Sequence, residues 1–243
     1  MRLPNVTLVS INCVNPLAGA QAMLYSMRGI EYKESILFTH EDASPVWDGI
    51  RVHKIPKLSY SEYNDFVLTL GRRMDCDFIL LVQDDGFVVS PELWDPQFLD
   101  YDYIGAPWPN EPSWIEQQVL KDEIRAVFPH NRVGNGGFSL RSRKFMNESS
   151  RYASCGGVGE DAFLCTLNYS NMIKAGVRFA PLDLAYKFSY ENPLLEYGHH
   201  WDERIDFNRA EHFGFHGRQF KNSDEIINLK SNGENTPDSV FKY

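Results

Sequence analysis

The first 85 residues alternate short apolar runs with longer stretches that carry a helical period. Strands are predicted for the apolar, β-rich runs at residues 6–11, 32–38, 49–55 and 78–82. Residues 17–30 and 59–74 repeat apolar side chains at helical spacing, and either Ser59 or Ser61 could cap the second helix. This alternation favours an α/β fold with a mostly parallel sheet and helices on both of its faces.

The carboxyl ends of the predicted strands carry the first functional indication, because ligands bind at those ends in sheets of this kind. Asn12 follows the first predicted strand, and Thr39 follows the second. Asp84 and Asp85 come just after the fourth, where the apolar run 78–82 ends abruptly. Polar side chains from separate parts of the chain are therefore expected to meet at one edge of the sheet.

The rest of the chain is richer in loops. Apolar spacing predicts further elements at residues 113–128, 144–152, 161–168, 177–180 and 184–188. The first three are expected to be helices, 177–180 is expected to be a strand, and a glycine-rich segment at 133–142 leads into another short strand.

No repeat or linker interrupts the sequence, which favours one domain over residues 1–243. Within it we expect a nucleotide-binding half at about 1–90 and a half for acceptor binding and catalysis at about 91–220. The polar tail at 221–243 is expected to be loose.

The charge balance excludes one class of partner. The chain has 24 Lys and Arg against 33 Asp and Glu, a net charge of −9, so the basic surface of a nucleic-acid-binding protein is not expected. An acidic protein that handles phosphorylated ligands usually holds a cation between its carboxylates and the phosphates.

The number and spacing of the cysteines indicate whether the protein works in a reducing or an oxidising compartment. Cys13, Cys76, Cys155 and Cys165 form no CxxC pair and match no zinc pattern, so we expect reduced and mostly buried thiols. The sequence has no stretch long enough to cross a bilayer and no apolar region typical of a signal peptide. These observations predict a cytoplasmic protein.

Asp84 and Asp85 are the strongest chemical feature. Adjacent carboxylates at the end of a buried strand repel each other unless water or a cation separates their charges. Mg²⁺ or Mn²⁺ accepts carboxylate oxygens and keeps positions for substrate phosphates. Because Asp and Gly are also common in solvated turns, the position alone leaves a metal site and a plain turn equally open.

Two glycine-rich segments indicate close approaches of the backbone. Residues 134–137 contain three glycines, which suits a loop against a sugar or a diphosphate, or a tight turn before a strand. Residues 156–161 end in Glu160 and Asp161 at a predicted helix start. A carboxylate there could remove a proton from a hydroxyl, or it could simply cap the helix.

His216 lies between apolar residues near the end of the chain. A histidine in such surroundings is more often a packed core residue, but a neutral imidazole also suits Mn²⁺ beside a carboxylate. His199 and His200 are weaker candidates, because adjacent side chains seldom point at one ion.

Taken together, these segments resemble a family of bacterial-type glycosyltransferases with the nucleotide-diphospho-sugar transferase (GT-A) fold. Its members carry, in order, the motifs QxDGFV, YDYIGAPW, VGNGGFSLRS, an ED pair and FGFHG. The corresponding segments here are residues 83–88, 101–108, 133–142, 160–161 and 213–217. The resemblance runs from about Val6 to Gly217 and implies a central, mostly parallel sheet flanked by helices.

The resemblance also implies a division of roles. Asp85 and His216 would bind Mn²⁺ or Mg²⁺, and Asp161, with Glu160 beside it, would act in catalysis as the base. The side chains and loop implied in nucleotide-sugar binding are Ser10, Asn12, Asp84, Gly136 and Gly137. Family members often have Asp where this chain has Asn12, which leaves the nucleobase open.

The implied activity is metal-dependent transfer of a sugar from a nucleotide-diphospho-sugar to a hydroxyl of a glycan or glycolipid, as in polysaccharide biosynthesis. With Asp161 as base, one direct displacement would invert the anomeric configuration. Retaining transfer on the same fold and a catalytically silent nucleotide- or sugar-binding module stay open. A metal phosphohydrolase ranks lower, because two-metal sites need more clustered ligands. Neither a nucleic-acid partner nor a transmembrane segment is expected, and peripheral membrane contact remains open.

Overall fold

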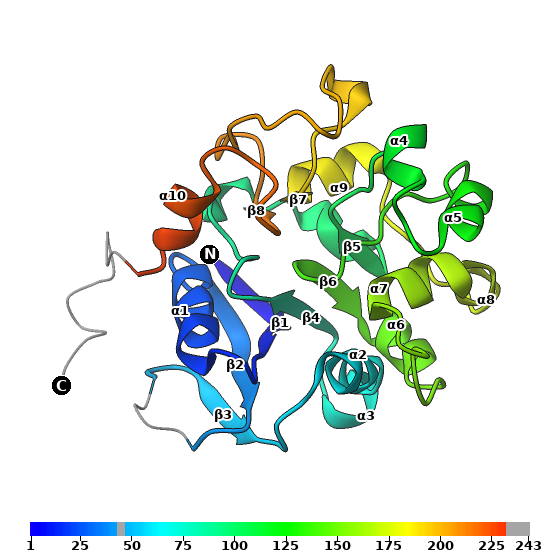
Figure 1. The fold of residues 1–243 in the computed structure, drawn as a ribbon. Coiled ribbons are helices and arrows are strands. Elements are labelled where there is room, and N and C mark those ends of the chain that lie inside the picture. Colours follow the sequence, from blue (N-terminus) through cyan, green and yellow to red (C-terminus); the bar gives the residue numbers. More distant parts are fainter. Residues whose placement is uncertain (43–46, 232–243) are drawn as a thin grey trace.

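A six-stranded sheet organises the computed structural model, which describes residues 1–42 and 47–231 (Figure 1). The strand order is β3-β2-β1-β4-β6-β5. In chain order, these strands are β1 (Arg2–Ile11), β2 (Glu31–Thr39), β3 (Arg51–Lys54), β4 (Phe78–Val82), β5 (Tyr103–Gly105) and β6 (Ser139–Ser142). A separate parallel pair is formed by β7 (Ser189–Tyr190) and β8 (Gly214–Phe215).

Strand pairing confirms the predicted parallel sheet and adds one exception. β1 pairs in parallel with both β2 and β4, and β3 pairs in parallel with β2. β6 runs antiparallel to its neighbours β4 and β5. Because β6 runs the opposite way, its first residues lie at the carboxyl end of β4, and the glycine-rich segment before β6 reaches that same edge.

The helices are α1 (Pro16–Ser26), α2 (Tyr60–Leu68), α3 (Leu70–Arg73), α4 (Pro112–Ile115), α5 (Lys121–Val127), α6 (Arg143–Ser149), α7 (Glu160–Ala162), α8 (Tyr169–Lys174), α9 (Leu182–Phe188) and α10 (Ser223–Asn228). Short 3₁₀ turns occupy Pro91–Leu93, Pro96–Asp100 and Leu195–Tyr197, and a π-helical turn occupies Phe163–Leu167. No helix within the described ranges is long and apolar enough to cross a membrane.

Helices cover both faces of the sheet, as the alternation predicts (Figure 1). Successive strand residues point to opposite faces. In β1, Leu8 belongs to the apolar cluster that contains Met23 of α1, whereas Val9 belongs to the cluster that contains Phe66 of α2. Each face of β1 therefore has its own apolar core.

Local chemistry explains where α2 begins. Ser59 is the N-cap, and its hydroxyl accepts a hydrogen bond from the backbone of Glu62. The Glu62 carboxylate accepts in return from the Ser59 backbone at 2.8 Å, which completes a capping box. Of the two serines considered from the sequence, the structure selects Ser59.

Three expectations for the second half are wrong. The helix expected over 113–128 is divided into α4 and α5, with residues 116–120 between them. Residues 177–180 form no strand, because their pairing is limited to a bridge between Tyr103 and Phe179. The expectation of a loose tail fails over 221–231, where α10 buries Ile226 and Ile227. Residues 232–243 lie outside the described residues.

Candidate active site

The Asp-Asp segment forms a tight turn directly after β4. Gln83 and Gly86 exchange backbone hydrogen bonds of 2.8 and 3.1 Å, which leaves Asp84 and Asp85 at the tip. A side chain at Gly86 would lie 2.9 Å from the His216 ring, so glycine allows the turn to press against this histidine. The two carboxylates are partly exposed, as a ligand site requires.

His216 meets this turn from the distant end of the chain. Its position follows from β8, because the His216 backbone donates to the Tyr190 carbonyl at 2.8 Å and Gly217 donates to the Asp85 carbonyl at 2.8 Å. His216 Nε2 lies 3.9 Å from Asp85 Oδ1 and 3.2 Å from Gln83 Oε1. The structure thus brings together the two side chains that the sequence predicts as metal ligands.

The other ring nitrogen of His216 meets residues that the sequence analysis missed. His216 Nδ1 lies 3.1 Å from Glu191 Oε1, and Asn135 Nδ2 donates to that same oxygen at 2.7 Å. Burial lowers the pKa of His216, but the Glu191 contact and nearby carboxylates outweigh it and raise the pKa above its usual value. An Nδ1–H bonded to Glu191 would leave Nε2 directed at Asp85.

Asp85 and His216 fit a shared divalent cation. Two ligand atoms that each lie about 2.1 Å from one ion can be separated by up to about 4.2 Å, so a separation of 3.9 Å is compatible with a common ion. Within the described ranges, no group of three or more His, Cys, Asp and Glu side chains is arranged to hold a metal. The remaining ligands would have to come from phosphate oxygens and water.

The glycine-rich loop lies between His216 and Asp161 because it has no side chains there. A side chain at Gly137 would overlap the His216 ring, 2.0 Å from Nε2. A side chain at Gly136 would lie 2.3 Å from Glu160 Oε1 and 3.1 Å from Asp161 Cβ. The sequence predicts contact with the sugar for both glycines, and the structure gives them a second role in close packing.

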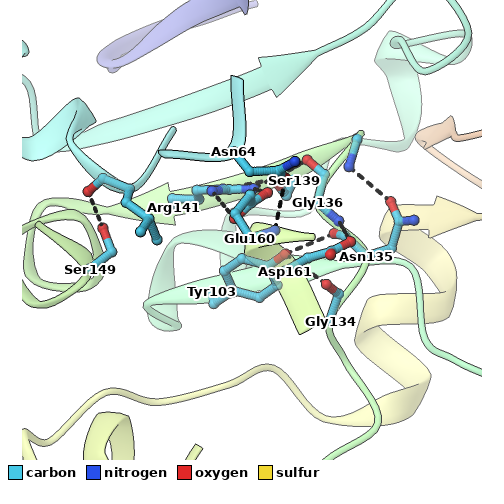
Figure 2. Close-up of polar contacts among 12 residues, drawn as sticks. Asn64, Tyr103, Gly134, Asn135, Gly136, Ser139, Arg141, Ser149, Glu160 and Asp161 are labelled. Carbon is cyan, nitrogen blue, oxygen red and sulfur yellow. Dashed lines mark hydrogen bonds and ion pairs between the residues drawn. The ribbon is translucent and has the colours of Figure 1, made fainter. Parts of the chain in front are cut away.

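Asp161 is held at the other side of this loop, at the N-terminus of α7. Its Oδ2 accepts from the Gly136 backbone at 3.0 Å (Figure 2). Its Oδ1 accepts from the Ala162 backbone at 2.7 Å. Burial and the neighbouring Glu160 carboxylate raise the pKa of Asp161 to about 6, although the two backbone donors act in the opposite direction. The carboxylate is therefore basic enough to accept a proton near neutral pH.

Asp161 and Tyr60 are both neighbours of Gly159. A side chain at Gly159 would lie 2.8 Å from Asp161 Oδ1 and 3.5 Å from the hydroxyl of Tyr60. Tyr60 belongs to α2, and 70% of its surface is exposed. Asp161 therefore lies close to the start of α2, with its carboxylate oxygens held by the backbone donors of Gly136 and Ala162.

Glu160 does not lie in the position expected of a catalytic residue. Both of its oxygens pair with Arg141, at 2.7 and 3.0 Å, and the two side chains are 4% and 3% exposed (Figure 2). Because its guanidinium is occupied by Glu160, Arg141 is not available to bind a diphosphate. Burial lowers the pKa of Arg141, but Glu160 more than compensates and raises it. The Glu160–Arg141 pair instead supports the glycine loop, because Arg141 donates to the Gly136 carbonyl at 3.2 Å.

We expect Glu160→Gln to destabilise the fold by about 3–5 kcal/mol, because it leaves the buried Arg141 charge without its partner. Urea denaturation followed by circular dichroism measures this loss. Glu148→Gln is the matched control, since Glu148 pairs with the largely exposed Arg151 and should change stability by less than about 1 kcal/mol. Equal stability of wild type and Glu160→Gln would contradict the structural role.

A pocket of about 310 Å³ opens beside the Asp-Asp turn, between the ends of β1 and β4 and the start of α2. Its lining includes Asn12, Val14, Tyr60, Tyr63 and Asp84. Asn12 Nδ2 lies within 3.3 Å of Asp84 Oδ1, which joins the first and fourth strand ends as predicted. The pocket offers both apolar surface and polar groups, a combination typical of small-molecule sites.

Ser10 is a correction to the predicted donor-binding set. Its side chain is fully buried and does not line the pocket. A side chain at Gly19 of α1 would lie 3.4 Å from Ser10 Oγ, so the hydroxyl lies beneath this helix. The strand alternation that directs Ser10 toward α1 is the physical reason, because only the residue at the strand end reaches the cleft.

Lys230 is a further residue that the sequence analysis missed. It follows α10 and donates from Nζ to the carbonyl of Asp84. Its Nζ also lies 5.5 Å from the centre of the Phe87 ring. Burial lowers the pKa of Lys230, whereas Asp84 and Asp85 act to raise it. The C-terminal helix therefore places a positive charge against the acidic turn.

Comparisons with known proteins agree with the fold. Crystal structures of the galactosyltransferase LgtC are similar over 96% of this chain and 98% of that chain, at 13% identity. The TM-score is 0.51 for LgtC in complex with donor and acceptor sugar analogs and 0.54 for an active-site mutant. This similarity confirms the predicted GT-A fold class.

Sequence comparison adds one family. The model of the family described as "Protein of unknown function (DUF5672)" matches residues 50–215. This span includes the Asp-Asp turn, the glycine-rich loop, Asp161 and β8. No curated protein matches the chain.

Proposed function

The chain belongs to DUF5672, and we propose that it is a metal-dependent glycosyltransferase that uses a nucleotide-diphospho-sugar donor. One observation carries the proposal most directly. On a GT-A fold, the glycine-rich loop holds His216 beside Asp85 on one side and Asp161 on the other. This arrangement would supply a cation site and a base, two groups that promote glycosyl transfer from a diphosphate donor.

The donor would occupy the pocket at the ends of β1 and β4. The exposed faces of Tyr60 and Val14 offer stacking surface to a nucleobase, and Asn12 and Asp84 offer polar groups to the ribose. The diphosphate would then lie at the acidic turn, where the Lys230 ammonium adds a positive charge. Asp85 and His216 would hold Mn²⁺ or Mg²⁺, which as a Lewis acid offsets the charge of the leaving diphosphate.

Asp161 would act on the acceptor. Its carboxylate takes the proton of the acceptor hydroxyl while that oxygen forms a bond to the anomeric carbon. The bond between the anomeric carbon and the diphosphate breaks in the same step, and its electron pair leaves with the nucleoside diphosphate. This single displacement inverts the anomeric configuration. Retaining transfer is the second candidate for the same site, and product anomers observed by NMR distinguish the two.

The acceptor we propose is a hydroxyl of a glycan or a glycolipid, as in polysaccharide synthesis. The net charge of −9 supports a neutral acceptor over a polyanion such as nucleic acid. Such a hydroxyl would approach Asp161 past the exposed Tyr60 side chain, which lies near it.

A panel of nucleotide sugars tests the proposal. Thermal unfolding is followed with each donor, with and without Mn²⁺, because a ligand that binds only the folded protein raises its melting temperature. Release of nucleoside diphosphate is measured in parallel. We expect at least one donor to stabilise the protein only with metal present and to be consumed. Binding without turnover would favour the silent binding module, and the absence of both would contradict the proposal.

We expect Glu191→Gln to weaken Mn²⁺ affinity by about 10–100-fold, the usual effect of losing a partner that orients a metal-binding histidine. Glutamine keeps an oxygen that can accept from Asn135 but removes the charge facing His216 Nδ1. Isothermal titration with Mn²⁺ and nucleoside diphosphate measures the change. Glu196→Gln, which removes the partially exposed partner of Arg132, is the control. Unchanged affinity in Glu191→Gln would remove Glu191 from this positioning role.

A further inference from the structure

Two adjoining cavities lie away from the candidate active site, between α9 and the segment 195–212 that follows it (yellow to orange in Figure 1). Their volumes are about 660 and 430 Å³, and Tyr186, Tyr197 and Glu211 line both. Such volumes match those of small-molecule sites, which lie between about 300 and 1,000 Å³. We refer to the two together as the tyrosine cavity.

Two stacked aromatic rings line both parts of the tyrosine cavity. The rings of Tyr186 and Tyr197 lie 3.7 Å apart between centroids, at an angle of 13°. The Tyr197 hydroxyl donates to Asp183 Oδ1 at 3.0 Å, which fixes its orientation. Both tyrosines are only partly buried, so the pair offers aromatic surface to a ligand.

A buried polar group in the smaller part has no partner. Tyr190 lines this part and is 2% exposed, yet its hydroxyl finds no hydrogen-bond partner among the residues that the structure describes. An unsatisfied buried hydroxyl costs about 1–3 kcal/mol. A phenylalanine would fill the same space without this cost. Because the hydroxyl oxygen has almost no accessible surface, a bound molecule would form a hydrogen bond with it after a small movement of the lining side chains.

Tyr190 also connects the tyrosine cavity to the backbone of the active site. It is the last residue of β7, and its neighbour Glu191 contacts His216. Successive residues of an extended strand point in opposite directions, which separates the two sites by the thickness of the β7–β8 pair. A ligand in the tyrosine cavity would therefore not occupy the donor pocket.

The charges of the tyrosine cavity restrict its ligand. The larger part is lined by Asp95, Asp183 and Glu211 against Lys187, and the smaller part adds Asp206 together with His199 and His212. This excess of carboxylates disfavours phosphates, nucleotides and other anions. Carboxylates and tyrosine hydroxyls do suit a neutral ligand rich in hydroxyl groups, and the stacked rings suit the apolar face of a sugar ring.

We propose that the tyrosine cavity is a second, non-catalytic site that binds neutral saccharide. The ligand class follows from the lining alone. Its use, holding a remote part of the glycan acceptor while the end of that glycan reacts, rests on the proposed function. An acceptor held at two sites would be bound more tightly than by the active site alone.

Saturation-transfer NMR and calorimetry of the full chain with lactose, maltotriose and mannotriose test this proposal. We expect at least one of them to bind the wild type, and we expect Tyr197→Leu to abolish that binding. Tyr190→Phe should weaken it by roughly 2- to 10-fold, the value of one neutral hydrogen bond. Because this variant removes an unsatisfied group, its melting temperature should be unchanged or higher.

Controls separate this inference from the proposed function. Tyr169→Leu, which changes an aromatic residue of α8 near Phe179, should leave saccharide binding intact. Asp85→Ala should also keep it, even though the metal-dependent increase in donor affinity is lost. Saccharide binding that survives both Tyr197→Leu and Tyr190→Phe, or its absence in a wild type that binds donor, would overturn the second site. Binding of trilysine in place of saccharides would identify the cavity as a cation site and would also overturn the proposal.

Discussion

Replacing Asp161 by asparagine should lower sugar transfer by about 10²–10⁴-fold, the usual contribution of a positioned general base. Asparagine has nearly the same shape and retains one oxygen that can accept from the backbone of Gly136 or Ala162. The fold and the affinity for the donor should therefore be preserved. Initial rates with saturating donor and acceptor, together with a donor titration, measure both quantities.

The pH dependence of the transfer rate distinguishes loss of the base in Asp161→Asn from distortion of the glycine-rich loop. Because the pKa of Asp161 is raised to about 6, its basic form is present above that pH and is lost as the pH falls through it. Wild-type transfer should accordingly decline below about pH 6, and the remaining activity of Asp161→Asn should lack this acidic limb. Asp75→Asn, at a fully exposed carboxylate, serves as the charge control. Wild-type rates in a folded Asp161→Asn protein would exclude Asp161 as the base.

Asp85→Ala should abolish the increase in nucleotide affinity that Mn²⁺ produces. The Asp85 carboxylate is one of two side chains that we expect to hold the ion, and its removal leaves His216 alone with the substrate phosphates. The loss should exceed the 10–100-fold effect expected for the indirect contact of Glu191. Calorimetric titration of nucleoside diphosphate with and without Mn²⁺ measures the increment directly.

Asp84→Ala is the matched comparison. Asp84 occupies the same turn but contacts Asn12 rather than His216, so its loss should weaken nucleotide binding equally with and without metal. The two variants are therefore expected to differ. Asp85→Ala should lose the metal-dependent increase in nucleotide affinity, and Asp84→Ala should keep it. A metal-dependent increment that persists in Asp85→Ala would argue against the cation site.

Much of the fold could be predicted because its signals are local. The apolar run at 78–82 is followed at once by polar residues, and β4 covers these five residues as predicted. The cap at Ser59 needs only the glutamate three residues later. Convergence at the strand ends also follows from the parallel arrangement, and Asn12 does meet Asp84.

Elements that depend on distant contacts could not be predicted. The tail is polar in sequence, yet α10 is held because its two isoleucines pack with Phe87 and Phe215 in one apolar cluster. Residues 177–180 have strand composition, but they meet the sheet at its edge through a bridge to Tyr103. The amino-acid composition of a segment does not show which distant part of the chain it will pack against.

The same limit applies to the candidate site. Motifs predict Asp85, Asp161 and His216, whereas Glu191 and Lys230 lie in none of the motifs described above. Only their contacts in the structure identify these two residues, since each reaches the site from a position far away in the sequence. Glu160 shows the opposite case. Its motif predicts a role in catalysis beside Asp161, but in the structure it pairs with Arg141.

The central claim is that Asp85 and His216 hold a cation for the donor's diphosphate while Asp161 faces the acceptor. A crystal structure with Mn²⁺ and a nucleoside diphosphate tests it most directly. We predict Mn²⁺ at about 2.1 Å from Asp85 and His216 Nε2, bridging to the phosphates, with Asp161 open to the cleft. An ion bound elsewhere, or a nucleotide seated away from the pocket between β1 and β4, would contradict the account.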